Sequence, residues 1–170
     1  MDSRMKLLEP PDSIHLKAAQ GWLELGNHVE ADAELDDIAP ALRIHPDVLE
    51  VRWQIYAMAR KWDACADIAA TITKLAPDKP LGWIHRSFAL HALKRTQEAR
   101  DNLLPVVEAF PHDALMRYNL ACYECQLGCL QQAKEWLQKA FETSREPTQL
   151  KLIALEDPDL EPLWRGIGSL

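Results

Sequence analysis

A small residue recurs every 34 positions along this chain, and this constrains the fold more than any other feature. The recurring residues are Ala31, Cys65, Ala99 and Ala133. A fixed period of this length is typical of chains built from repeated helix-turn-helix units, each stacked on its neighbours. Two helices of one unit approach closely only where no bulky side chain holds them apart, which explains the small residues. The period therefore predicts an all-α repeat fold.

Two apolar columns follow the same phase. Taken at this period, the chain divides into four rows, 12–45, 46–79, 80–113 and 114–147. The twenty-fourth position of the rows holds Leu35, Ala69, Leu103 and Leu137, and the twenty-seventh holds Ile38, Ile72, Val106 and Ala140. Residues three apart lie on one face of a helix. The columns therefore predict a buried face on the second helix of each row.

The turn between the two helices of a row carries its own signal. Rows one and four place Gly26 and Gly128 there, at a position where a positive φ is often required. Rows two and three place Arg60 and Lys94 at the same point. Because these residues disfavour a positive φ, we expect those two turns to be built differently.

On these positions residues 12–147 resemble the tetratricopeptide repeat (TPR) family. Row four fits the family pattern best, through Leu120, Ala121, Gly128, Ala133, Leu137 and Ala140. The resemblance implies a right-handed α-solenoid of helix-turn-helix repeats, with the first helices lining a concave groove. Residues 1–11, with two adjacent prolines, are expected to form a leader. Residues 148–170 are expected to form a C-terminal cap whose helix begins near Pro147.

The C-terminal tail also offers an alternative interpretation. Its sequence from Glu156 to Trp164 resembles the ending of many bacterial TPR proteins, which suggests a bacterial source. Leu160, Leu163 and Trp164 are expected to share one helical face. Capping of the last repeat is the favoured role for such a segment. The alternative is that the tail folds back into the groove as an internal ligand.

Composition excludes several classes of function. With 19 basic and 26 acidic residues among 170, the net charge is −7, which argues against nucleic acid as a partner. No run of about 18 apolar residues is present, so no membrane span is expected. The first six residues lack the apolar core of a signal peptide. Four cysteines without an export signal indicate reduced thiols and a cytoplasmic location.

By the same resemblance, six positions of each first helix point into the groove. In rows one and two they include Gln20, Leu23, Glu24, Gln54 and Met58, and in row four they include Gln126. The residues expected to contact a partner are Met58, Leu81, Ile84, His85, Phe88, His91, Leu115, Tyr118, Asn119 and Cys122. Burying such apolar side chains is worth about 25 cal/mol per Å². A partner with apolar anchors is therefore expected, and the basic clamp that grips C-terminal carboxylates in some family members is absent.

Two groups of residues could carry chemistry. Cys122, Cys125 and Cys129 approach one side of a helix, but a second Cys or His pair of the kind that completes a structural zinc site is missing. His85 and His91 diverge by more than half a helical turn, and no nucleophile lies nearby in the sequence. We therefore expect no catalytic residues, no metal and no cofactor.

The sequence thus predicts a non-catalytic interaction module, a scaffold or adaptor that binds a protein or peptide with apolar anchors. Neither nucleic acid nor membrane is an expected partner, and homo-oligomerisation is left open. Two alternatives remain. The first is a small chaperone of the type III secretion translocator kind, although the short leader with two prolines fits that class poorly. The second is a metal- or redox-responsive adaptor that uses the cysteines of row four.

Overall fold

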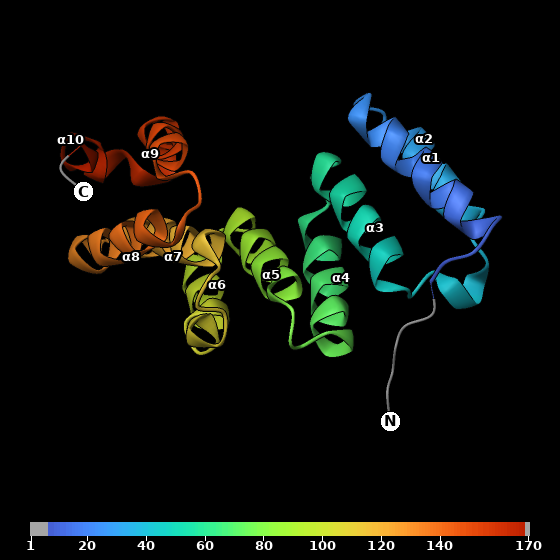
Figure 1. The fold of residues 1–170 in the computed structure, drawn as a ribbon, viewed down its shortest axis with the longest axis horizontal. Coiled ribbons are helices and arrows are strands. Elements are labelled where there is room, and N and C mark those ends of the chain that lie inside the picture. Colours follow the sequence, from blue (N-terminus) through green and yellow to red (C-terminus); the bar gives the residue numbers. More distant parts are fainter. Residues whose placement is uncertain (1–6, 169–170) are drawn as a thin grey trace. The chain divides into compact units, whose positions relative to one another are not determined.

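A computed structural model describes residues 7–168, and every regular element in that range is helical (Figure 1). The α-helices are α1 (Asp12–Glu24), α2 (His28–Asp36), α3 (Pro46–Met58), α4 (Trp62–Leu75), α5 (Pro80–Ala92), α6 (Thr96–Leu103), α7 (Ala114–Gln126), α8 (Leu130–Thr143), α9 (Pro147–Glu156) and α10 (Trp164–Ile167). Three 3-10 helices join them: η1 (Pro40–Leu42), η2 (Val107–Ala109) and η3 (Pro158–Leu163). None of the helices described is both long and apolar enough to span a membrane.

The helices follow one another in pairs at a constant interval. The first helices of the four pairs begin at residues 12, 46, 80 and 114, and the second helices begin at 28, 62, 96 and 130. Each series therefore advances by 34 residues (46 − 12 = 34). The two helices of every pair pack against each other. The fold is all-α and repeat-like, as the period of small residues predicts.

The chain divides into two compact units. Unit 1 (Met1–Pro77) contains α1 to α4, in which α1 and α2 both pack on α3. Unit 2 (Asp78–Leu170) contains α5 to α10, in which α7 packs on α5, α6, α8 and η3. Of the leader expected over 1–11, only residues 7–11 are described, and Leu8 among them is buried in the core of unit 1. Each unit has its own hydrophobic core.

The small residues of the 34-residue column lie where the two helices of each pair meet. Ala31, Cys65, Ala99 and Ala133 are all fully buried, at 0% exposure. The Cys65 thiol lies 3.7 Å from the Trp53 carbonyl oxygen, so it contacts the backbone of the paired helix directly. Burial also raises the pKa of this thiol to about 11. The column is therefore a packing requirement.

All four turns between paired helices have the same construction, so the prediction that rows two and three differ is wrong. Arg60 and Lys94 adopt φ values of 57° and 64°, close to the 76° and 81° of Gly26 and Gly128. In each turn the next residue donates its N–H to the carbonyl five residues earlier, in the pairs Asn27–Trp22, Lys61–Tyr56, Arg95–Leu90 and Cys129–Glu124. This bond closes the helix end in a Schellman motif. The bond pattern of the repeat thus overrides the preference of the individual residue.

The C-terminal tail is part of the core of unit 2. The helix expected near Pro147 is α9, which packs against α8. After it, η3 lies against α7, and Leu160, Leu163 and Ile167 are almost completely buried. The Trp164 indole N–H donates to the Ala154 carbonyl at 3.1 Å and so ties α10 back to α9. Residues 169–170 of the expected cap lie outside the described residues.

Candidate interaction surfaces

Unit 1 has an open pocket between α1 and α3. It has a volume of about 540 Å³ and is lined by Gln20, Leu23, Glu24, Gln54 and Met58. All five occupy positions that the sequence assigns to the groove. Met58 is 44% exposed, so its thioether and methyl group remain available. The pocket therefore offers an apolar floor of Leu23 and Met58 with amides and one carboxylate around it.

In unit 2, the corresponding face of α7 is occupied by the chain's own tail. The Tyr118 hydroxyl donates to Oδ2 of Asp157 at 2.8 Å, and the Cys122 thiol lies 3.6 Å from the same oxygen. The other carboxylate oxygen of Asp157 accepts the backbone N–H of Asp159 at 3.0 Å and so begins η3. One carboxylate thus both starts the tail's 3-10 helix and holds it on α7.

A second carboxylate of the tail reaches α5. Nε2 of His91 lies 2.9 Å from Oδ2 of Asp159, and Nδ1 of the same ring lies 2.9 Å from the Thr96 hydroxyl. The Gln126 amide donates to the Asp159 backbone carbonyl at 3.0 Å. The His91 ring also packs against Tyr123, with centroids 5.0 Å apart. Polar side chains of α5 and α7 therefore fix the tail at both Asp157 and Asp159.

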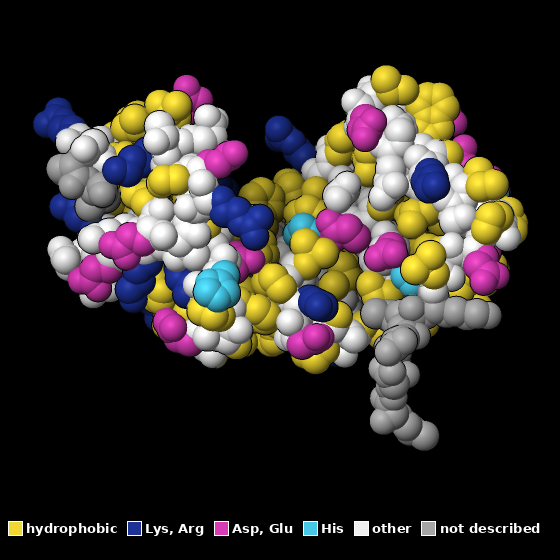
Figure 2. Space-filling model, in the orientation of Figure 1, with side chains coloured by type: hydrophobic (Ala, Val, Ile, Leu, Met, Phe, Trp, Pro, Cys, Tyr) yellow, Lys and Arg dark blue, Asp and Glu magenta, His cyan; other side chains and the backbone are white. Residues whose placement is uncertain are grey.

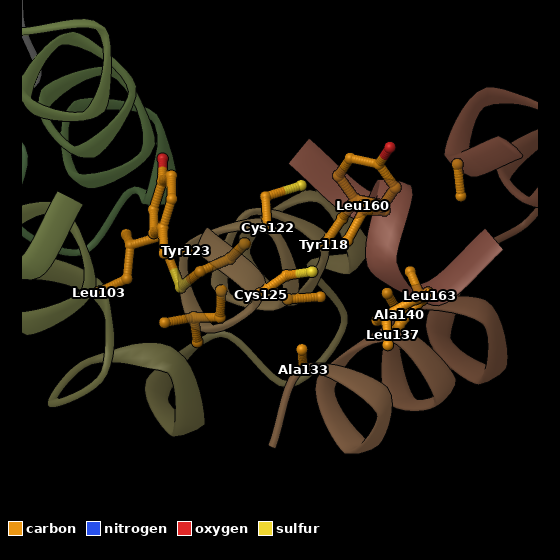
Figure 3. Close-up of a cluster of buried hydrophobic side chains, with 14 of the residues drawn as sticks. Leu103, Tyr118, Cys122, Tyr123, Cys125, Ala133, Leu137, Ala140, Leu160 and Leu163 are labelled. Atoms are coloured by element: carbon orange, nitrogen blue, oxygen red, sulfur yellow. The ribbon is translucent and has the colours of Figure 1, made fainter. Parts of the chain in front are cut away.

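An apolar anchor lies between these polar contacts and the core. Leu160 is fully buried and belongs to the same cluster of buried side chains as Tyr118, Leu137 and Leu163 (Figure 3). The tail therefore contacts both surfaces that the two alternative interpretations involve. Its helix α9 packs on the last repeat-like pair, and η3 occupies the predicted groove positions of α5 and α7.

The structure places the ten predicted contact residues in three classes. Ile84, Tyr118, Asn119 and Cys122 are buried. His85 and His91 are half-buried. Met58, Leu81, Phe88 and Leu115 are exposed. Three of the ten, His91, Tyr118 and Cys122, come together under the tail, and Met58 alone lies in unit 1.

Burial and the neighbouring carboxylates change the titration of the groups under the tail. Burial raises the pKa of the Cys122 thiol well above its ordinary value, and the charges of Asp157 and Asp159 raise it further. Burial and the hydrogen bond to Asp157 likewise raise the pKa of the Tyr118 hydroxyl. Reactive cysteines need a lowered pKa and access to solvent. The environment of Cys122 is therefore that of an inert, structural thiol.

A separate cluster in unit 1 combines His15 with two carboxylates. One ligand atom each from His15, Glu34 and Asp37 lies within 4.8 Å of the others, and among residues 7–168 this is the group of metal-ligating side chains that comes together. Within that range the row-four cysteines do not form such a group. The 2.9 Å hydrogen bond between Nδ1 of His15 and Glu34 raises the pKa of the imidazole, and the charge of Asp37 adds to the effect. The cluster joins α1 to the C-terminal end of α2.

The sequence pattern does not single out Asp157 and Asp159 as residues that contact Tyr118 and His91. Both residues belong to the acidic segment around Pro158, which is visible in the sequence. Asp157, however, lies 39 residues after its partner Tyr118. No local pattern connects residues that far apart. Only the complementarity between the tail's carboxylates and the His and Tyr at groove positions could have indicated the contact.

Comparisons with known proteins assign no family to the chain. No protein-family model matches it, and no curated protein sequence matches it. The main guide to function is therefore the geometry of two surfaces: the open pocket between α1 and α3 in unit 1, and the face of α7 that the tail covers in unit 2.

Proposed function

We propose that this protein is a non-catalytic interaction module of the TPR kind, a scaffold or adaptor that binds a segment of another protein in the pocket between α1 and α3. One observation carries the proposal. The five residues that line this open pocket all occupy positions that the repeat pattern assigns to the binding face. The residues at such positions in unit 2, including Tyr118 and Cys122, hold a polypeptide segment of the chain itself.

The tail indicates what kind of segment this class of surface accommodates. It presents a short 3-10 helix with Leu160 as a buried anchor and with the polar groups of Asp157 and Asp159 fixed just before it. Burial of a leucine side chain contributes about 1.5–3 kcal/mol, and the polar contacts set orientation more than affinity. A partner of the unit 1 pocket is therefore expected to be a short helical or extended segment with one apolar anchor.

The chemistry of the pocket narrows the partner further. Met58 and Leu23 provide apolar contact area, and methionine adapts readily to anchors of different shape. Gln54 donates its amide N–H to Glu50 at 2.9 Å, which leaves the amide oxygen to accept from a partner, and Glu24 adds a carboxylate to the lining. The residues that flank the anchor should therefore be neutral donors or basic. The net charge of −7 is consistent with a protein partner and unfavourable for nucleic acid.

The test is an affinity pull-down from the native lysate with the full chain and a Met58→Asp variant. The Met58 side chain is exposed, so the variant should fold, which far-ultraviolet circular dichroism checks. A charge in the apolar floor should weaken binding at least tenfold, because the anchor would be buried against a carboxylate. Each captured protein is then purified and its affinity measured for both forms.

The matched control is Ile44→Asp, which adds a charge to an exposed apolar residue of the same unit outside the pocket. The proposal requires the control to bind as the unmodified protein does. Partners that bind the Met58→Asp variant with unchanged affinity would show that the pocket is not the binding site.

A further inference from the structure

The side of α1 that faces away from the core of unit 1 carries an exposed apolar stripe. Ile14 is 60% exposed and Leu25 is 76% exposed, and Ala18 and Gly21 lie between them. At about 100° per residue these four positions fall within about 60° of each other around the helix. Leu16 and Ala19, which face the core, lie on the opposite side. Figure 2 shows hydrophobic side chains exposed on the part of unit 1 that contains α1.

The packing of unit 1 does not explain why position 21 holds a glycine. A glycine in the middle of a helix costs roughly 0.5–1 kcal/mol relative to alanine. A Cβ added at Gly21 would meet no atom within 4 Å, so nothing in unit 1 requires its absence. A hollow over the same place is lined by Ala18, Gly21, Trp22, Glu24 and Leu25. The positions 18, 21, 22 and 25 have the spacing of a hole that receives a side chain from a facing helix.

The stripe is complementary to itself in an antiparallel arrangement. In two antiparallel helices related by a two-fold axis, residues whose numbers add to a constant face each other. The sums 14 + 25 = 39 and 18 + 21 = 39 agree. Ile14 of one copy would therefore face Leu25 of the other, at both ends of the contact. Ala18 would face Gly21 at the centre, where small side chains allow the two helices to approach closely.

The charges beside the stripe agree with the same axis. Lys17 and Glu24 are both exposed and lie on one edge of the stripe, about 20° apart around α1. A two-fold axis keeps this edge of one copy next to the same edge of the other. Their sum, 17 + 24 = 41, differs by two from that of the apolar pairs, which is about 3 Å along the helix. Each Lys17 would thus lie opposite a Glu24, twice in the dimer.

We propose that the outer face of α1 binds a second copy of this chain, α1 against α1 in antiparallel orientation, with Ala18 and Gly21 at the crossing point. The inference does not depend on the proposed function, because the apolar stripe and the apolar floor of the unit 1 pocket lie on different faces of α1 and only Glu24, at the edge between them, belongs to both. One helix face is smaller than a standard interface of about 1,600 Å². The dimer is therefore of the weak class, with a dissociation constant in the micromolar range.

The test is sedimentation velocity of the purified full chain over a series of concentrations, compared with Ala18→Glu and Leu25→Asp. Leu25 is so exposed that its substitution should leave the fold intact, and Thr71→Glu on α4 is the control with the same added charge. The proposal predicts a monomer–dimer equilibrium for the unmodified chain and for Thr71→Glu. For Ala18→Glu and Leu25→Asp it predicts dissociation constants raised at least tenfold.

The orientation is tested by reversing the charges. Lys17→Glu and Glu24→Lys should each weaken self-association, since like charges would face each other twice in the antiparallel pair. An equimolar mixture of the two variants should associate again, because every charge then faces its opposite. In a parallel pair the two-fold axis would place this edge of one copy on the opposite side of the contact from the same edge of the other. Lys17 and Glu24 would then not meet across the contact, and neither single reversal would weaken association.

Three results would overturn the proposal. The first is a chain that stays monomeric at all concentrations. The second is self-association that both Ala18→Glu and Leu25→Asp leave unchanged, which would place the contact elsewhere. The third is self-association that neither Lys17→Glu nor Glu24→Lys weakens, which would exclude the antiparallel orientation.

Discussion

Replacing Lys94 by glycine should stabilise unit 2, although it removes a side chain. Lys94 holds φ at 64° in the turn between α5 and α6. An L-residue pays about 1–2 kcal/mol for this conformation, and glycine loses almost nothing. The greater freedom of glycine in the unfolded chain offsets about 0.4–1 kcal/mol of the gain. The net expectation is a free energy of unfolding higher by about 0.5–1 kcal/mol.

Urea denaturation followed by far-ultraviolet circular dichroism measures this change. With a slope of about 2 kcal/mol per molar urea, the midpoint should rise by about 0.3–0.5 M. Lys94→Ala is the matched control, because it removes the charged side chain and keeps the Cβ that causes the strain; it should leave the midpoint nearly unchanged. Gly128→Ala should lower the midpoint by a similar amount. Because its Cβ would meet no atom within 4 Å, this cost comes from the backbone alone.

The outcome that contradicts the reasoning is a Lys94→Gly variant no more stable than Lys94→Ala. It would mean that the left-handed turn carries no strain in this sequence, and that the four turns share their geometry for another reason.

Three further predictions concern the titratable groups. Tyr118→Phe removes the donor to the tail carboxylate and should lower the stability of unit 2 by about 1–2 kcal/mol in the same urea assay. Glu34→Gln should lower the pKa of His15 toward 6.5 in an NMR titration. Since the folded-state pKa is raised, the pair stabilises the fold fully below the unfolded pKa of 6.5 and less as pH rises through the folded value. Iodoacetamide at neutral pH should label the half-buried Cys129 before Cys122, as mass spectrometry of the native protein can show.

The sequence allows prediction of what repeats and not of what occurs once. Helix starts at 34-residue intervals can be predicted because Ala31, Ala99 and Ala133 occupy the same position of successive repeats and are all fully buried. The positive φ at Arg60 and Lys94 cannot be predicted from the conformational preference of these residues. Their φ is imposed by hydrogen bonds of the flanking helices, which outweigh an unfavourable cost of about 1–2 kcal/mol.

The tail illustrates the second limit. Its helix and its apolar residues can be predicted locally, but the surface on which η3 lies depends on partners up to 68 residues away, in the case of His91 and Asp159. Groove positions in a repeat pattern indicate where a ligand could bind. They do not indicate that the chain supplies the ligand itself. Tyr118 and Cys122 stand at predicted groove positions and yet are buried, because the tail contacts them.

The tail-covered face of α7 in unit 2 and the open pocket of unit 1 carry different charges, and this affects which segments each can bind. In unit 2 the tail's carboxylates meet donors, the Tyr118 hydroxyl and the His91 ring. In unit 1 a segment with acidic residues beside its anchor would meet the carboxylate of Glu24. It would also approach Glu50, which is hydrogen-bonded to the pocket residue Gln54. Like charges brought together in a pocket cost free energy and so reject the wrong ligand. As the proposed binding site, the unit 1 pocket is therefore expected to reject a segment like the chain's own tail, and its partner should carry the opposite charge beside its apolar anchor.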